Sequence, residues 1–192
     1  MKIPKNTRVF IFEGISGAGK STIKKELYDH FRDKNIYTFT DEQLLFNYTH
    51  VHIPNVSEIR LRFYQVFLDY VNDTLKKDSN AIFILERFHI SARVLEWEFN
   101  KDFEENYSKV ISKLKKLPCH VIVPVLEESE IEEKSAHKER FKDSFLDFQW
   151  RLYLEEKMKL RGFPNIESLY IDEQRKVLAA IKEQDIPHSI IK

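Results

Sequence analysis

The chain has 192 residues, of which 42% are hydrophobic, and this composition is typical of one globular domain spanning residues 1–192. Lysine plus arginine and aspartate plus glutamate both total 31, so the chain lacks the basic excess that favours nucleic-acid binding. The longest apolar run, Val121–Leu126, is too short to cross a membrane, and Met1–Lys5 lacks the apolar core of a signal peptide. We therefore expect a cytoplasmic protein with no nucleic-acid or membrane partner.

The first predicted strand, Arg8–Phe12, leads directly into the most informative segment of the chain. Residues 12–22 read Phe-Glu-Gly-Ile-Ser-Gly-Ala-Gly-Lys-Ser-Thr and contain the pattern Gly-x-x-x-x-Gly-Lys-Ser of a phosphate-binding P-loop. The chain has four glycines, and three of them lie in this segment, where the backbone must curl with positive φ. A helix is predicted over Lys20–Lys34, so that its N-terminus faces the phosphates.

The P-loop pattern assigns chemistry to its residues. Backbone N–H groups from Ser16 to Ser21 are expected to surround the phosphates, with Lys20 on the β- and γ-phosphates and the Ser21 hydroxyl on Mg²⁺. The segment therefore predicts binding of a nucleoside triphosphate. The residues expected to contact it are Gly14, Ser16, Gly17, Ala18, Gly19, Lys20, Ser21 and Thr22.

Apolar runs and helical patterns alternate along the rest of the chain. The further predicted strands are Asn35–Thr40, Ala81–Leu85, His120–Leu126 and Ser168–Ile171, and the tail Ile186–Ile191 is a candidate edge strand. Helices are predicted at Ser57–Lys77, Ser91–Lys116 (in two pieces), Asp143–Arg161 and about 173–184. This alternation predicts an α/β fold with a parallel sheet covered by helices on both faces. Cys119, the only cysteine, is expected to be a buried hydrophobe.

The third strand is followed by a carboxylate and an arginine, Glu86 and Arg87. Because the carboxyl ends of parallel strands open into the ligand crevice, these side chains are expected near the P-loop. Glu86 can hold Mg²⁺ through water, and Arg87 can bind phosphate or the phosphoryl group in transfer. Alternatively, the two residues form a structural pair that caps the next helix. The chain has no Asp-x-x-Gly motif and no paired glycines, which excludes a GTPase and a transport ATPase.

The P-loop and the second motif together resemble a known family. Residues 13–22 with Glu86-Arg87-x-x-x-Ser91-Ala92-Arg93 resemble the deoxynucleoside kinases. The related thymidylate kinases share the Phe-Glu-Gly opening and carry Asp-Arg-Tyr where this chain has Glu86-Arg87-Phe88. The resemblance implies a three-layer P-loop kinase fold with five parallel strands and ATP or another nucleoside triphosphate as donor. A nucleoside or nucleoside monophosphate is implied as acceptor. Helices corresponding to 57–77 and 91–116 pair in relatives, which allows a homodimer.

The resemblance also implies residues on the acceptor side. A glutamate after the second strand is the general base in deoxynucleoside kinases, which points to Glu42, with Asp41 as second candidate. Alternatively, Asp41 caps the next helix and Glu42 lies in its first turn. A base-binding glutamine of the family corresponds to Gln65. From its own position and charge, Arg87 is a further candidate for contact with an acceptor phosphate.

The helix that carries Gln65 has two stripes. Its core face is expected to consist of Ile59, Phe63, Val66, Phe67 and Tyr70. The other stripe, with Arg62, Gln65 and Asp69, is either a wall of the site or plain surface. Phe88, Tyr64 and Trp97 are candidates for stacking on the acceptor, or core residues.

Residues 127–142 are rich in charge and follow the fourth strand. They are either a solvated helix with ion pairs such as Glu130 with Lys134, or a mobile lid over the triphosphate, and their position favours the lid. Arg140 is its only arginine and a candidate phosphate ligand.

The chain also departs from the two families. It lacks the Glu-Pro and Arg-Glu-Pro-Gly-Gly motifs after the second strand, and Ser16 replaces an aspartate of thymidylate kinases. The acceptor is therefore left open between a nucleoside, a nucleotide and another small alcohol. A nucleotide-dependent binding or regulatory module is the alternative to an enzyme.

Overall fold

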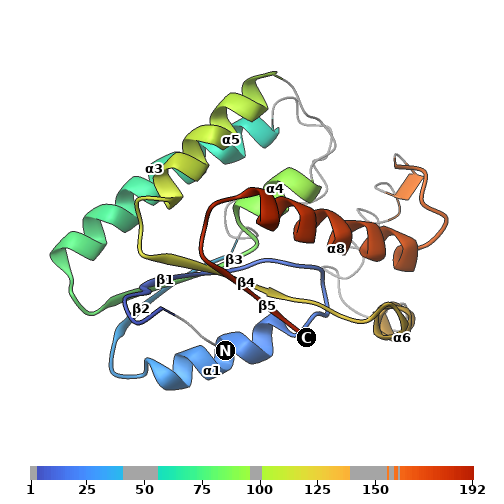
Figure 1. Cartoon of the computed structure of the whole chain (residues 1–192), viewed down its shortest axis with the longest axis horizontal. Coiled ribbons are helices and arrows are strands. Elements are labelled where there is room, and N and C mark those ends of the chain that lie inside the picture. Colours follow the sequence, from blue (N-terminus) through green and yellow to red (C-terminus); the bar gives the residue numbers. More distant parts are fainter. Residues whose placement is uncertain (1–3, 41–55, 96–100, 139–154, 156–157, 160) are drawn as a thin grey trace.

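The computed structural model describes residues 4–40, 56–95, 101–138, 155, 158–159 and 161–192 (Figure 1). One parallel sheet runs through the described chain, with the strand order β2-β3-β1-β4-β5. Its strands are β1 (Val9–Phe12), β2 (Asn35–Thr40), β3 (Ala81–Glu86), β4 (Cys119–Pro124) and β5 (His188–Ile191). The predicted α/β class with five parallel strands is thus confirmed.

The register of the central strand determines what lies beside the P-loop. Val9 of β1 pairs with Phe83 of β3 on one side and with Cys119 of β4 on the other. At the carboxyl end of β1, Phe12 is therefore opposite Glu86. The P-loop and the Glu86-Arg87 motif consequently start from the same edge of the sheet.

Helices cover both faces of the sheet, as the alternating pattern predicts. Figure 1 shows α1 (Lys20–His30) on one face and α3 (Val56–Lys77), α4 (His89–Leu95), α5 (Lys101–Leu114) and α8 (Ile166–Glu183) on the other. Alternate residues of β1 enter the two cores: Phe10 and Phe12 pack with Leu27 of α1, whereas Val9 and Ile11 belong to the opposite core. A further helix, α6 (Glu128–Lys138), lies beyond the end of β4. Among the described helices, none is both long and apolar enough to cross a bilayer.

The fifth strand is not the one predicted at Ser168–Ile171, and that prediction is wrong. These residues lie in the first turns of α8, where the side chain of Asn165 caps the helix by accepting a hydrogen bond from the Ser168 amide at 2.8 Å. The buried residues of α8 recur at helical spacing, namely Leu169, Tyr170, Glu173, Val177, Ala180 and Ile181. A short apolar run does not by itself distinguish a strand from a buried helical turn. The tail supplies the edge strand β5 instead, as expected.

The predicted core face of α3 is also wrong. Ile59, Phe63, Val66 and Tyr70 are 40% to 67% exposed, and Phe67 is partly buried. The buried face consists of Leu61, Tyr64, Leu68, Val71 and Leu75. Because α3 carries large apolar residues on both sides, the helical period fits either stripe, and only the packing against the sheet and α5 decides between them.

Other predictions agree with the structure. The region 91–116 forms two helices, and the bounds of β2 are those expected. Cys119 is buried and free, and burial raises the pKa of its thiol to about 11, as befits a core residue. The predicted helix Asp143–Arg161 lies largely outside the described residues.

Candidate functional site

The P-loop has a backbone conformation that depends on its glycines. Gly14, Gly17 and Gly19 have φ of 118°, 87° and 87°, in the left-handed region that favours glycine. At Gly14 a side chain would also place its Cβ 3.0 Å from the carbonyl oxygen of Pro124, at the end of β4. Gly19 is the N-cap of α1, and its carbonyl oxygen accepts hydrogen bonds from the Thr22 and Ile23 amides.

Lys20 is folded under this loop. Its side chain is buried, and its Nζ donates hydrogen bonds to the carbonyl oxygens of Gly14 at 3.1 Å and Ile15 at 2.7 Å. Ala18 is buried against the first turns of α8, whereas Gly17, Ser21 and Thr22 are exposed and Ser16 is half-buried. A cation under a curled loop, with hydroxyls at its open side, fits a polyphosphate.

Glu86 is fixed at the end of β3 by an ion pair. Its Oε2 lies 2.5 Å from Nζ of Lys24, one turn into α1, and both side chains are about four-fifths buried. Because the amides of Ile90 and Ser91 at the start of α4 donate to Glu13, as described below, Glu86 does not cap this helix, and the structural alternative does not apply to it. Together with the Ser21 hydroxyl, this carboxylate provides oxygen ligands of the kind Mg²⁺ prefers. Within the described part of the chain, no group of three or more His, Cys, Asp or Glu could hold a metal by itself.

Arg87 has an unusual backbone conformation. Its φ is 54°, and it is the only non-glycine residue with positive φ within the described ranges. Its amide donates to the Phe12 carbonyl oxygen at 2.9 Å, which extends the pairing of β3 with β1 by one residue. The next residue, Phe88, is fully buried, and its ring centroid lies 4.1 Å from that of Tyr64. Phe88 and Tyr64 are thus core residues, which was the alternative to stacking on the acceptor.

A buried residue beside the P-loop to which the sequence analysis assigned no role is Glu13. It is fully buried directly before the P-loop. Its Oε1 accepts the amides of Phe88 at 3.1 Å and Ile90 at 2.9 Å, and its Oε2 accepts the amide and hydroxyl of Ser91 at 3.1 and 2.5 Å. The cap of α4 is therefore this glutamate. Burial raises its pKa to about 7, against the opposing effect of these hydrogen bonds.

A chain of buried polar groups continues from Glu13 to the end of α8. His89 Nδ1 lies 3.6 Å from Glu13 Oε1, and its Nε2 contacts Gln184 Oε1 at 2.8 Å. The Gln184 amide donates in turn to the Tyr107 hydroxyl, above whose ring the guanidinium of Arg93 lies at 4.9 Å. Burial lowers the pKa of His89 to about 4, so the imidazole is neutral near pH 7. One sign of this network is present in the sequence, namely that the carboxylate of Glu13 lies between an apolar strand and a glycine turn.

The α3 residues that the sequence suggested for the acceptor are engaged with neighbouring side chains. Gln65 Nε2 donates to Asn106 Oδ1 on α5 at 3.1 Å and to the Leu61 carbonyl oxygen at 3.3 Å. Arg62 is exposed and pairs with Glu58, one turn earlier on the helix. Asp41, Glu42, Trp97 and Arg140 lie outside the described residues.

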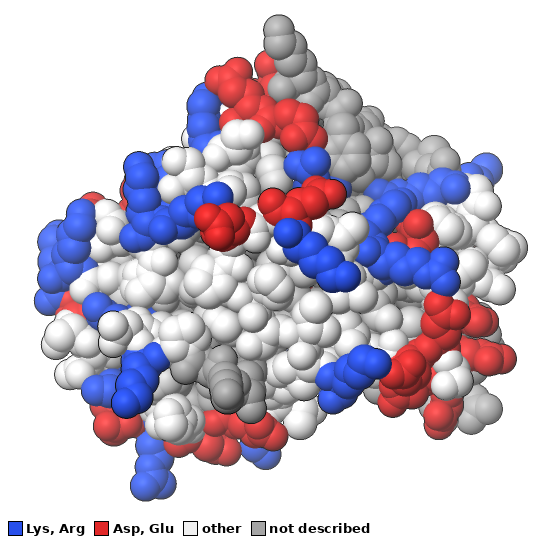
Figure 2. Space-filling model, in the orientation of Figure 1, with Lys and Arg blue, Asp and Glu red and all other residues white. Residues whose placement is uncertain are grey.

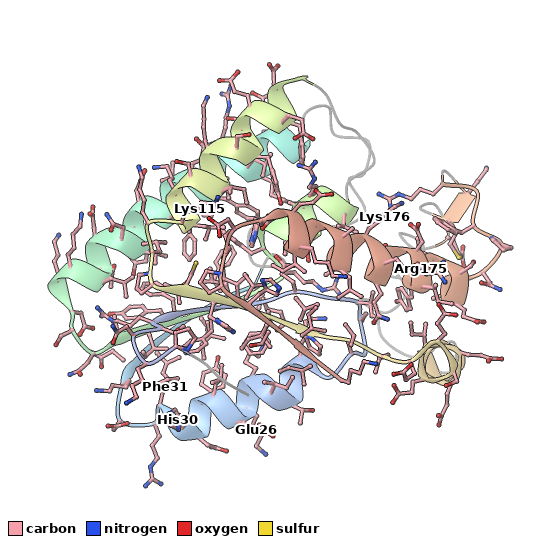
Figure 3. The ribbon with its side chains drawn as sticks, in the orientation of Figure 1. Glu26, His30, Phe31, Lys115, Arg175 and Lys176 are labelled. Carbon is pink, nitrogen blue, oxygen red and sulfur yellow. The ribbon has the colours of Figure 1, made fainter. Side chains whose placement is uncertain are left out.

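The candidate lid includes a helix that contacts the P-loop region. Ile131 of α6 is buried in a cluster with Ile15 and Ala18 of the loop and Leu169 and Tyr170 of α8. The other face of α6 is acidic, and Figure 2 shows this red cluster at the α6 end of the molecule; its members include Glu127, Glu128, Glu130, Glu132 and Glu133. Arg175 on α8, labelled in Figure 3, pairs with Glu128 at 2.6 Å.

Comparison with known proteins supports the fold. No protein-family model and no curated protein matches the chain. Three solved structures are similar to it at TM-scores of 0.53 to 0.55. The Bacillus subtilis YorR protein, in complex with phosphorylated GDP, is 16% identical, with 95% of this chain and 84% of that chain covered. Thymidylate kinase from Ehrlichia chaffeensis is 14% identical, with 97% of this chain and 93% of that chain covered. Thymidylate kinase from Candida albicans is 13% identical, with 96% of this chain and 83% of that chain covered. The chain has a P-loop kinase fold.

Proposed function

We propose that the protein is an ATP-dependent kinase that transfers a phosphoryl group to a small acceptor, with a nucleoside or nucleoside monophosphate as the leading class. The observation that carries this proposal is the edge where β1 and β3 end side by side. There the left-handed glycines and Lys20 of the P-loop adjoin Glu86 and Arg87. A binding module would need the loop, but it would have less use for the carboxylate and the arginine beside it.

Each residue at this edge has a role in the proposed reaction. Lys20 releases its carbonyl contacts and places its ammonium on the β- and γ-phosphates, where charge develops during transfer. The Ser21 hydroxyl, and Glu86 through water, would hold Mg²⁺, which neutralises phosphate charge when bound. Arg87 contributes a charge-assisted hydrogen bond to the phosphoryl group or to an acceptor phosphate.

The acceptor hydroxyl needs a group that takes its proton. We assign this role to Glu42, with Asp41 as the second candidate, because both follow β2 in the sequence and the carboxyl end of β2 lies on the same edge of the sheet as the end of β1. Gln65 is assigned to the acceptor through the resemblance, and Arg62 because it lies on the same stripe of α3. The nucleotide class is supported by the similar structures, two of which are thymidylate kinases and one a complex with phosphorylated GDP.

Residues 127–142 are proposed to act as a lid within the single domain 1–192, with Arg140 as its phosphate ligand. The burial of Ile131 in one cluster with Ile15 and Ala18 supports this proposal, since a movement of α6 would change the packing beside the P-loop. In this proposal the acidic face of α6 remains toward solvent.

The test of the proposed function is transfer of label from γ-labelled ATP to a panel of nucleosides, nucleoside monophosphates and sugars in the presence of Mg²⁺. Lys20→Ala protein, prepared in the same way, controls for contaminating kinases. Labelled nucleoside or nucleotide supports the proposal, whereas a labelled sugar would identify a kinase of another alcohol. Tight nucleotide binding without transfer to any acceptor would contradict the kinase and favour a regulatory module.

A further inference from the structure

Glu13 connects the two loops of the candidate site, although the proposed reaction assigns it no task. It follows the last residue of β1, and its carboxylate accepts four hydrogen bonds from the segment Phe88–Ser91, described above. A buried carboxylate is costly unless its oxygens are hydrogen-bonded, and here the bonds come from a single neighbouring segment. The contact is thus specific for the loop that follows Arg87.

The position of Arg87 depends on this contact. A left-handed backbone conformation is unfavourable for arginine and persists only where its surroundings enforce it. Before Arg87, Glu86 is paired with Lys24, and the Arg87 amide is bonded to the Phe12 carbonyl oxygen. After it, the Phe88 amide is bonded to Glu13. The amides on both sides of the Arg87 α-carbon are therefore fixed by neighbouring residues of one segment. The Arg87 amide is bonded to the carbonyl oxygen of Phe12, and the Phe88 amide to the carboxylate of Glu13.

The next turn is held in the same way. The amides of Ile90 and Ser91 are in the first turn of α4, where helical N–H groups have no partner within the helix. His89, between them and Phe88, is fixed at its other nitrogen by Gln184. Without the carboxylate, these amides would lose their acceptor in a buried place, and the start of α4 would rearrange.

We propose that Glu13 is a positioning residue that holds the backbone of Arg87 so that its guanidinium faces the phosphoryl group bound at the P-loop; this inference rests on the phosphoryl transfer proposed above. Because Glu13 and the P-loop are contiguous, the donor loop and the arginine are positioned by one rigid unit. Glu13 acts through Arg87 and does not touch the phosphates.

The test is a double-mutant cycle of Glu13→Gln with Arg87→Ala, measured as kcat and KM for ATP. Glutamine keeps the size of the side chain but turns an NH₂ group toward one pair of donors. Glu13→Gln is expected to lower kcat about 10- to 100-fold, as a small misplacement of a catalytic group does, with KM for ATP changed less than about threefold. In the Arg87→Ala background the same change should lower kcat by no more than about twofold, because the residue it positions is gone.

A merely structural role gives a different result. If Glu13→Gln lowers kcat by the same factor with and without Arg87, or leaves kcat unchanged, the inference is overturned. Glu26→Gln, at an exposed glutamate of α1 labelled in Figure 3, is the matched control and should have no effect. If Glu13→Gln does not fold, Ser91→Ala is the substitute variant, because it removes the hydroxyl that donates to Glu13. It should lower kcat about threefold in the wild-type background and leave kcat unchanged in the Arg87→Ala background.

A second measurement separates this inference from the proposed function. Amide hydrogen exchange at Phe88, Ile90 and Ser91 should be at least about tenfold faster in Glu13→Gln than in the wild type and in Glu26→Gln. If the wild type phosphorylates no acceptor while exchange accelerates as expected, the proposed function fails but the positioning of the loop stands. If exchange is unchanged, the positioning role is excluded whatever the activity.

Discussion

The P-loop is one uninterrupted segment, whereas the residues proposed for the acceptor come from elements that are distant in the sequence. The P-loop side, which would bind the phosphate donor, needs a strand, three glycines with left-handed backbone conformation and Lys20, all within residues 9–22. The acceptor side needs the end of β2, the middle of α3 and the end of β3, each placed by packing. A local motif carries its own geometry, while a dispersed site depends on the sheet register and on which face of a helix is buried.

Lys20→Ala tests the donor side and should have the largest effect. Removing the ammonium should lower turnover by about 10²- to 10⁴-fold, because its charge acts mainly in the transition state. Thermal stability should change little by comparison, through the loss of the two hydrogen bonds to the Gly14 and Ile15 carbonyl oxygens. Steady-state kinetics and a melting curve are the measurements. Lys25→Ala, at the exposed residue 25 of the same helix, is the control. Wild-type turnover in Lys20→Ala would contradict the kinase.

Glu42→Gln tests the acceptor side. We expect acceptor phosphorylation to fall about 10²-fold, because the amide cannot take the hydroxyl proton, while the Kd for ATP stays near that of the wild type. Asp41→Asn is the matched control and should retain most of the activity. If Asp41→Asn is inactive and Glu42→Gln is active, the general base is Asp41 and the resemblance after β2 is shifted by one residue.

The pair Glu13 and His89, where the two sides meet, predicts an unusual dependence of stability on pH. Glu13 is protonated in the folded state and ionised in the unfolded state between about pH 4.5 and 7, so its contribution to stability decreases as pH rises. His89 is neutral when folded and protonated when unfolded between about pH 4 and 6.5, so its contribution increases. The two effects nearly cancel in the wild type.

Single variants should reveal the two opposing contributions. Relative to the wild type, Glu13→Gln should gain roughly 2–3 kcal/mol of unfolding free energy as pH rises from 4.5 to 7, because the decreasing contribution of Glu13 is removed. His89→Gln should lose a similar amount relative to the wild type from pH 4 to 6.5, because the increasing contribution of His89 is removed. Urea unfolding at half-unit pH steps measures both. Curves that run parallel to the wild type would show that these groups do not titrate on unfolding as described.

The lid prediction concerns the segment that would close over both sides. With ATP and Mg²⁺, amides of residues 127–142 should exchange about tenfold more slowly than without them, since closure adds contacts to a segment with a single buried apolar residue, Ile131, among its described side chains. The amides of α5 serve as the internal control. Equal, strong protection with and without nucleotide would mean an ordinary surface helix.

The exposed stripe of α3 should have the smallest effect on the fold of the protomer. Val66→Glu should change the unfolding free energy by no more than about 0.5 kcal/mol, because Val66 is 67% exposed. If the expected homodimer forms through this stripe, the same variant should be monomeric in sedimentation equilibrium at concentrations where the wild type is not. Leu68→Ala, on the buried face, is the contrasting control and should cost about 2–5 kcal/mol.

The sequence predicted the parts of the molecule that are local and failed where packing decides. The strand, glycine turn and helix around Lys20 follow from contiguous residues, and the strand-end rule placed Glu86 beside them. The exposed position of Val66 could not be predicted, because α3 is apolar on two sides. The cap by Glu13 could not be predicted either, since its first partner, Phe88, is 75 residues away along the chain.

The central position of β1 also has a consequence for the order of folding. β1 is near the start of the chain, but both of its neighbours, β3 and β4, follow much later. During synthesis the fully apolar segment Val9–Phe12 therefore emerges long before either strand that pairs with it. Such a high contact order slows folding and leaves a hydrophobic strand exposed to aggregation in the meantime. The nascent chain thus carries the complete phosphate-binding motif early, but it acquires the supporting sheet only when β4 has left the ribosome.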